Sequence, residues 1–168
     1  MTMTPRLRNF ALTAHVISSV GSLGAVAGFL ALAVAGLVSH DAQMVRAAYL
    51  AMDLIAWFVV VPLVLASLLT GIVQSLGTTW GLFQYYWVVV KLLLTVFVTV
   101  VLLLQTQSIS YMAGVAAKTA LSHADFREAR LSLVVHAGGG LLVLLVPAFL
   151  SVYKPQGTTP YGWRKQQD

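Results

Sequence analysis

The sequence contains no cysteine and few charged residues. Its 168 residues include 10 Lys and Arg and 5 Asp and Glu, so charged side chains make up 9% of the chain, whereas a typical soluble domain has about a quarter. The missing cysteine excludes disulfide frameworks, thiol redox chemistry and cysteine-ligated metals. Apolar residues take the place of charge: 59% of the chain is hydrophobic, and its mean hydropathy is +0.87. Most of the chain therefore does not face water, as in an integral membrane protein.

Four apolar stretches are long enough to cross a membrane as helices, since a span needs about 20 apolar residues. Helices are expected because the alternating pattern of a membrane β-barrel is absent. Short connections place consecutive helices side by side and antiparallel. The sequence therefore predicts an all-α membrane protein, a single four-helix transmembrane up-down bundle over residues 1–168. The predicted spans cover about residues 9–38, 47–74, 83–105 and 131–153, and a basic cytoplasmic tail follows over residues 154–168.

Two further predictions concern the segments around the spans. The apolar run from Phe10 to Val38 is far longer than the roughly 7–15 residues of a signal-peptide core, so we expect it to remain in the protein as a membrane anchor. The third connection, from Thr106 to Arg130, is charged near its end. We expect a short amphipathic surface helix there, carried by Asp125, Arg127, Glu128 and Arg130.

Lys and Arg predict the orientation, because cytoplasmic segments carry an excess of them. Five flank the two ends of the chain, and four lie in the first and third connections. We therefore expect both termini in the cytoplasm and the chain in the bacterial inner membrane. This spread of cations fits lipid headgroups better than nucleic acid. The third span also begins with residues typical of an interfacial aromatic belt, namely Trp80, Phe83, Tyr85, Tyr86 and Trp87.

Function in such a chain is best sought at polar groups within the spans, because a charge at mid-bilayer costs about 2.5–3.5 kcal/mol on insertion scales. At 1.5 Å per residue, two such groups enter from the cytoplasmic side and two from the opposite side, to similar depths. The first two are His15 and Lys91, and we expect them to pair. The second two are Asp53 and His136, and we expect Asp53 to pair with His136 or with Arg46.

Helical spacing shows which residues share a face with each of these polar residues. A narrow polar stripe joins His15 to Ser18, Ser19 and Ser22, while Gly24 and Gly28 form a small-xxx-small packing motif on another face. Gly139 and Gly140 follow His136, and bare glycine backbone beside a histidine leaves room for a flat ligand. Serines and glycines also simply pack helices, Asp53 can neutralise Arg46, and Lys91 can snorkel to the interface. The remaining polar residues on these faces are Gln84 and Gln105.

Helix depth limits how a haem could be held. Two histidines that ligate one iron must lie at nearly the same height, and a core about 30 Å thick separates His15 from His136 by roughly 14 Å. One haem bridging the two within a subunit is therefore not expected. Each histidine remains a candidate haem-iron ligand in a site of its own.

Two segments resemble known membrane proteins. The stretch Ala14–Gly21 and the tail from Val152 to Gly162 resemble a bacterial family of integral membrane proteins of unknown function, over nearly the whole chain. The early histidine, and the Trp87-x-x-x-Lys91 pattern, are more distantly similar to the copper-resistance membrane domain and the membrane-embedded protoporphyrinogen oxidase family. In those groups a tryptophan is expected where this chain has Ser22. The resemblance implies His15 as a b-type haem ligand, with Lys91 near a propionate or an acidic substrate.

Three functions fit these patterns. The first is a small inner-membrane protein that binds a b-type haem or related tetrapyrrole, with a redox or haem-related role. The second is a transporter or ion-coupling protein that uses Asp53 and Lys91. The third is a non-catalytic subunit or scaffold that binds itself or other membrane subunits through the Gly24 and Gly28 face. The sequence shows no nucleophile–base pair, phosphate loop or carboxylate dyad, which disfavours a hydrolase or kinase and leaves open whether the protein is an enzyme.

Overall fold

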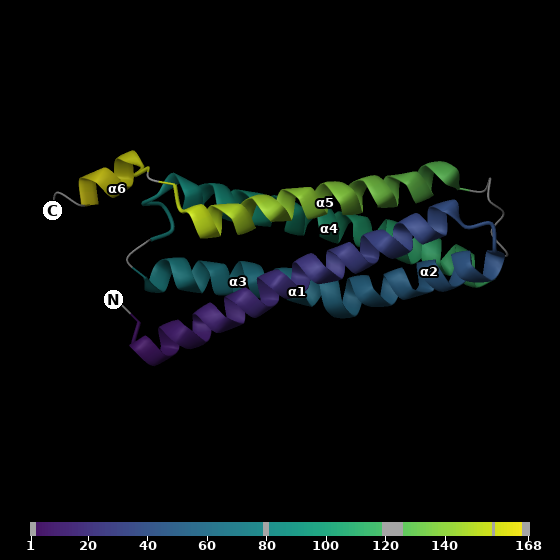
Figure 1. Ribbon diagram of the computed structural model, residues 1–168, viewed down its shortest axis with the longest axis horizontal. Coiled ribbons are helices and arrows are strands. Elements are labelled where there is room, and N and C mark those ends of the chain that lie inside the picture. Colours follow the sequence, from purple (N-terminus) through teal and green to yellow (C-terminus); the bar gives the residue numbers. More distant parts are fainter. Residues whose placement is uncertain (1–2, 79–80, 119–125, 156, 166–168) are drawn as a thin grey trace.

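The computed structural model describes residues 3–78, 81–118, 126–155 and 157–165, and they form a bundle of long helices (Figure 1). Four helical segments are long and apolar enough to cross a membrane, as the sequence predicts. The elements, in chain order, are α1 (Pro5–Val38), α2 (Ala42–Ile55), η1 (Ala56–Val60), α3 (Val61–Gly77), α4 (Tyr86–Lys118), α5 (Arg127–Tyr153) and α6 (Pro160–Lys165). No strand occurs in these described ranges, although Tyr85 and Thr158 form an isolated bridge.

Local chemistry explains where α1 ends and α2 begins. Pro5 starts α1, at a position where its missing N–H is not needed. The backbone becomes extended at Ser39, and Asp41 then caps α2 by accepting a hydrogen bond from the Gln43 N–H at 2.9 Å. The turn between the two helices is therefore short, and it brings α1 and α2 into contact.

The second span is one helix with a wider π-helical turn in its middle. This turn, η1, separates α2 from α3, and Pro62 is the second residue of α3. Proline has no N–H, and its ring clashes with the carbonyl four residues earlier in a regular α-helix. A wider turn moves that carbonyl away, so Pro62 accounts for the local change of pitch.

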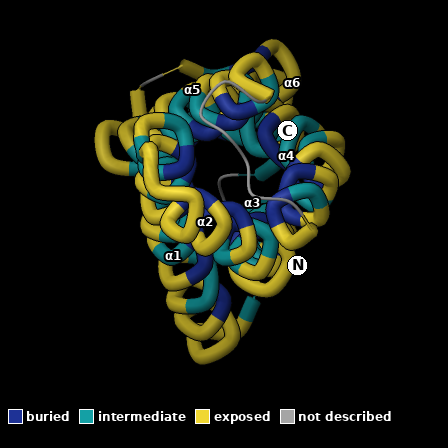
Figure 2. Tube along the Cα trace, turned by 90° about the vertical axis from the view of Figure 1, so that its right-hand side faces the viewer, coloured by how far each residue is buried: buried dark blue, intermediate teal, exposed yellow. Residues whose placement is uncertain are grey.

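The helices close into a bundle around a packed interior. Helix α1 packs against α2, α3 and α5, while α4 packs against α2, α3 and α5, and Figure 2 shows the buried residues turned inward. Tight packing depends on Gly36, where a Cβ would lie 2.9 Å from Cζ of Tyr49. The two core clusters are centred on Phe29, Tyr49, Met52, Met112 and Leu133, and on Val26, Val60, Val64, Val98 and Leu144.

The prediction of an amphipathic surface helix in the third connection is wrong for the residues that the structure describes. Thr106 to Lys118 continue α4, and Arg127 already begins α5, while Asp125 lies outside the described residues. Arg130 is fully buried, with 0% exposure, and its guanidinium lies 5.8 Å from the centre of the Tyr49 ring. A guanidinium over an aromatic face is a favourable buried arrangement, and residue counts alone do not reveal it.

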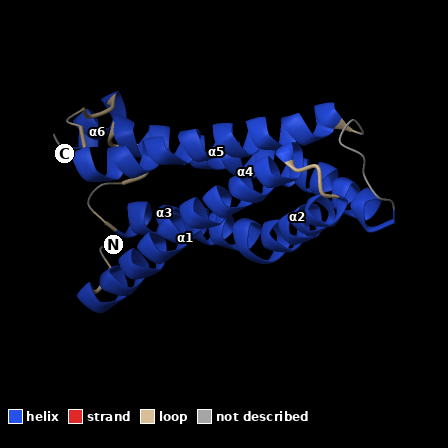
Figure 3. Ribbon diagram, turned by 45° about the vertical axis from the view of Figure 1, so that its right-hand side comes forward, coloured by secondary structure: helices blue, strands red, loops and turns tan. Residues whose placement is uncertain are grey.

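The C-terminal tail is fastened to the loop before α4, at the end of the bundle where Figure 1 places both termini. Tyr86 N–H donates to Gly157 O at 3.2 Å, and Thr159 N–H donates to Gln84 O at 2.9 Å. A Cβ on Gly162 would collide with the Gln84 carbonyl, so only glycine allows this approach. Figure 3 shows the short helix α6 lying beside the ends of α4 and α5.

Candidate functional site

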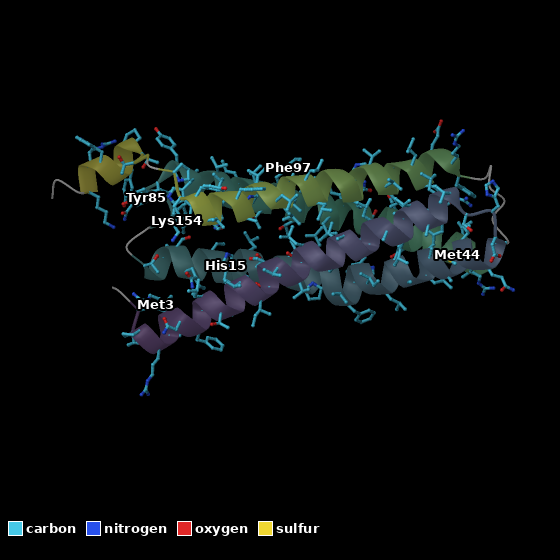
Figure 4. The ribbon with its side chains drawn as sticks, in the orientation of Figure 1. Met3, His15, Met44, Tyr85, Phe97 and Lys154 are labelled. Carbon is cyan, nitrogen blue, oxygen red and sulfur yellow. The ribbon has the colours of Figure 1, made fainter. Side chains whose placement is uncertain are left out.

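A cavity of about 340 Å³ lies between α4 and α5, within the range of about 300–1,000 Å³ typical of small-molecule sites. Side chains from α1 and from η1 to α3 form its inner wall, including Val26 and Val60. Phe97, labelled in Figure 4, lies on the α4 side. The lining is apolar apart from Gln105 and His136. The cavity therefore suits a largely apolar ligand with one or two polar contacts.

Hydrogen bonds to the preceding helical turn orient the imidazole of His136. Its Nδ1 lies 2.7 Å from Ser132 O and 3.2 Å from Ser132 Oγ. A carbonyl oxygen only accepts, so Nδ1 carries the hydrogen and donates it. In the neutral ring Nε2 then keeps its lone pair. Histidines that bind metals are commonly held this way, because the Nδ1 hydrogen bond fixes the ring and frees Nε2.

The glycines after His136 keep the cavity open. A Cβ on Gly139 or Gly140 would meet no atom within 4 Å, so both positions border empty space. Gly138 faces α1 instead, where its Cβ would lie 4.0 Å from Leu30. The structure thus brings His136, Gly139, Gly140 and Gln105 together around one cavity.

His15 lies in a different, more polar setting between α1 and α3. Its Nδ1 lies 3.1 Å from Ser67 O and 3.1 Å from Thr70 Oγ1. A Cβ on Gly71 would lie 3.1 Å from Cε1 of His15, so this glycine makes room for the ring. Ser19 supports the contact through its Oγ, 2.8 Å from Ser67 Oγ. The imidazole is therefore fixed by α3, with Nδ1 as the donor to the carbonyl.

Lys91 turns inward toward α5. Its Nζ donates to Ser151 Oγ at 2.6 Å and lies 5.5 Å from the centre of the Trp87 ring. Lys91 is near enough to interact electrostatically with His15, but each of the two makes its hydrogen bonds to other residues. Figure 4 shows His15 and Lys154 in the half of the molecule that holds the termini.

The two histidines lie far apart along the bundle. Gly138, close to His136 in sequence, faces Leu30, and Leu30 lies about 22 Å from His15 along α1 at 1.5 Å per residue. They cannot share one iron within the chain. No group of three His, Asp or Glu that could hold a metal ion occurs in the described ranges. A haem needs fewer protein ligands, because the macrocycle itself supplies most of the iron coordination.

The expected pairing of Asp53 with Arg46 or His136 is wrong. Asp53 Oδ1 accepts a hydrogen bond from Ser110 Oγ at 2.6 Å. Ser110 Oγ in turn accepts a hydrogen bond from Trp57 Nε1 at 3.1 Å. Arg46 is exposed on α2. Ser110 belongs to the part of α4 beyond Gln105, where the sequence predicts a connection and not a helix, so this partner was not expected.

The other predicted residues fall in separate places. Gly24 and Gly28 are exposed, and a Cβ on either would meet no atom within 4 Å, so neither packs helices within the chain. Gln84 lies in the loop that holds the tail through its backbone carbonyl. None of these three residues belongs to the cavity or to the surroundings of His15.

Several partners of the polar residues were not singled out from the sequence. Ser67, Thr70, Ser110 and Ser151 hold His15, Asp53 and Lys91 in place. Each is an ordinary small polar residue in an apolar helix. Only the three-dimensional packing of the helices identifies which hydroxyl meets which charge.

Comparisons with protein-family models, with curated proteins and with solved structures found no match for this chain. The resemblances noted from the sequence therefore stay predictions, and the function is inferred from the geometry of the polar residues.

Proposed function

We propose that this protein binds a b-type haem, or a closely related tetrapyrrole, in the cavity between α4 and α5, with His136 Nε2 as the axial ligand to the iron. The single observation that supports this most is the orientation of His136. Its Nδ1 is hydrogen-bonded to Ser132 O at 2.7 Å, so Nε2 is free to coordinate, and the residue lines an apolar cavity.

The surroundings of His136 favour a ligand over lipid contact alone. His136 is exposed in the isolated bundle, so in a bilayer it would face hydrocarbon unless something covers it. A polar group left without a partner in hydrocarbon is costly. The open space beside Gly139 and Gly140 gives a flat macrocycle access to the helix backbone.

The tautomer of His136 also favours haem over a quinone as the bound ligand. A quinone carbonyl needs a donor, whereas neutral His136 offers a lone pair at Nε2 because Nδ1 holds the hydrogen. A metal centre accepts that lone pair directly. Bound haem supplies one-electron redox chemistry, and the chain contributes the axial ligand, the apolar surroundings and the exclusion of water.

The proposal places the protein in the bacterial inner membrane as an up-down bundle with both termini in the cytoplasm. The excess of Lys and Arg at the chain ends supports this orientation. Both termini lie at one end of the bundle in Figure 1, which supports placing them on the same side of the membrane.

Transport along a line from Asp53 to Lys91 has less support. Ser110, the partner of Asp53, lies about 28 Å along α4 from Lys91 at 1.5 Å per residue. The hydroxyls of Thr95, Thr99 and Thr106 between them each donate to a carbonyl of α4 itself. These groups are satisfied within the helix and do not require an aqueous path.

Visible absorption of the purified full-length protein, produced with haem supplementation, tests the proposal. We expect a Soret band that is lost in His136→Ala and kept in His15→Ala, because only His136 lines the cavity. Gly139→Leu is a second variant: its side chain points into empty space, so it should fill the cavity and reduce haem content without unfolding the bundle. A wild-type protein with no Soret band, or an unchanged band in His136→Ala, would contradict the proposal.

A further inference from the structure

Gln105 is the second polar side chain, besides His136, that lines the cavity between α4 and α5. It is partly buried, and its carboxamide makes no hydrogen bond within the described part of the chain. The next residue differs, because Thr106 Oγ1 donates to Leu103 O at 2.7 Å. A carboxamide without a partner in an apolar setting is costly. Gln105 is therefore a group that a ligand in the cavity would satisfy.

Gln105 and His136 lie at nearly the same height in the bundle. Helices α4 and α5 run in opposite directions in Figure 1, and Ile109 of α4 packs in one core cluster with Leu133 of α5. At 1.5 Å per residue, Gln105 lies about 6 Å from Ile109 along α4. His136 lies about 5 Å from Leu133 along α5, and both displacements point toward the end that holds the termini. The two polar groups therefore reach the cavity from neighbouring helices at matching positions.

The cavity offers one strong ligand to an iron. In the proposed haem site the macrocycle supplies most of the coordination, and His136 Nε2 supplies the fifth ligand. Apart from Gln105, the rest of the described lining consists of aliphatic side chains, phenylalanine and glycine, which do not coordinate metals. An amide oxygen suits harder cations such as Mg²⁺ better than haem iron. The sixth position of the iron is therefore left for a ligand from outside the chain.

We propose that this sixth position takes a small diatomic gas, and that Gln105 donates a hydrogen bond to it from its side-chain amide. This inference rests on the haem function proposed above and adds the class of ligand. An apolar lining favours a small uncharged molecule over an anion. Coordination to iron polarises such a molecule, so its outer atom accepts a hydrogen bond, and a carboxamide has two N–H groups to donate. Donors near the open side of a haem decide whether it binds gases or only carries electrons.

Carbon monoxide, added to the purified full-length protein after haem loading and reduction, is the probe that tests this inference. We expect it to shift the Soret band of the wild type. The infrared C–O stretch then reports on Gln105, because a hydrogen-bond donor beside the bound gas lowers its frequency. Gln105→Leu removes the donor, so the stretch should move to higher frequency. Gln107→Leu is the matched control and should resemble the wild type, since this exposed glutamine of α4 does not line the cavity.

Haem content, measured on the same samples, separates this inference from the proposed function. Wild-type protein without haem would overturn both. Haem-loaded wild type that does not bind carbon monoxide, or that shows the same C–O stretch as Gln105→Leu, would overturn the role of Gln105 and leave the haem site standing. Gln105→Leu should keep its haem, because its side chain gives up no hydrogen bond within the described residues. Loss of haem from this variant alone would mean that Gln105 holds the macrocycle and not the gas.

A second variant keeps the test decisive if Gln105→Leu does not fold. Gln105→Ala removes the same amide without adding a branched side chain, and alanine favours a helix. We expect its C–O stretch to move in the same direction as in Gln105→Leu. A stretch that stays at the wild-type frequency in Gln105→Ala would contradict the hydrogen bond.

Discussion

Single residues decide how closely the helices of this bundle approach one another. Gly36 sits against the ring of Tyr49, where a Cβ would lie 2.9 Å from Cζ. Gly24 is in the same helix, yet a Cβ there would meet no atom within 4 Å. The two glycines look alike in the sequence, and only the packing of α1 against α2 distinguishes them.

Gly36→Ala should therefore destabilise the protein by about 1–3 kcal/mol, the usual cost of overpacking a core. Gly24→Ala is the matched control and should be neutral or slightly stabilising, because alanine favours a helix. Denaturant-induced loss of helicity in detergent measures both. Equal stability of the two variants would show that α1 does not approach Tyr49 as described.

The hydroxyl of Ser110 is a second residue with a specific role, since it joins Asp53 and Trp57 across two helices. Ser110→Ala would leave both partners without this bond, so we expect a loss of about 1–3 kcal/mol. Ser108→Ala, an exposed position on the same helix, should change stability by less than about 0.5 kcal/mol. The same unfolding measurement applies, and a Ser110→Ala protein as stable as the wild type would refute this role.

At the scale of helices, the sequence predicts what depends on length and apolar content and misses what depends on pairing. The four spans follow from apolar runs of sufficient length and are confirmed. The continuation of α4 past Gln105 was missed, because small and polar residues such as Ser108 and Ser110 end an apolar run without ending a helix. The partner of Asp53 was missed for the same reason, because Ser110 lies in this continuation of α4.

The tail and the loop before α4 form an element that no apolar pattern predicts. Backbone hydrogen bonds hold it, and Gly162 permits the contact with the Gln84 carbonyl. Gly162→Ala should detach the tail and speed hydrogen exchange at the amides of Tyr86 and Thr159. Gly157→Ala is the control, because its Cβ would make an ordinary 3.7 Å contact with Tyr86. Unchanged exchange in Gly162→Ala would mean that the tail is not fastened there.

At the scale of the whole molecule, the bundle separates two kinds of polar surroundings. His136 lines an apolar cavity between α4 and α5, and His15 lies in a polar setting near Lys91 at the end that holds the termini. Both histidines can be named from the sequence, but the cavity cannot, because a cavity is a property of several helices together. Of the two histidines, the structure therefore shifts the haem proposal from His15 to His136.

The orientation of the whole chain can be measured directly, because the natural sequence has no cysteine. Single cysteines at Thr4, Ser39 and Lys165 can be labelled in intact cells with a membrane-impermeant maleimide. We expect Ser39→Cys to react from outside, and Thr4→Cys and Lys165→Cys to react only after the membrane is opened. Labelling of either terminal position in intact cells would reverse the proposed topology.

The amount of haem bound per chain tests the central claim most directly. Purified wild-type protein, saturated with haem and freed of excess, should hold one haem per chain, because one cavity carries one suitably oriented histidine. His136→Ala should hold none under the same conditions. A wild-type value near zero, or an equal amount of haem in His136→Ala, would contradict the account.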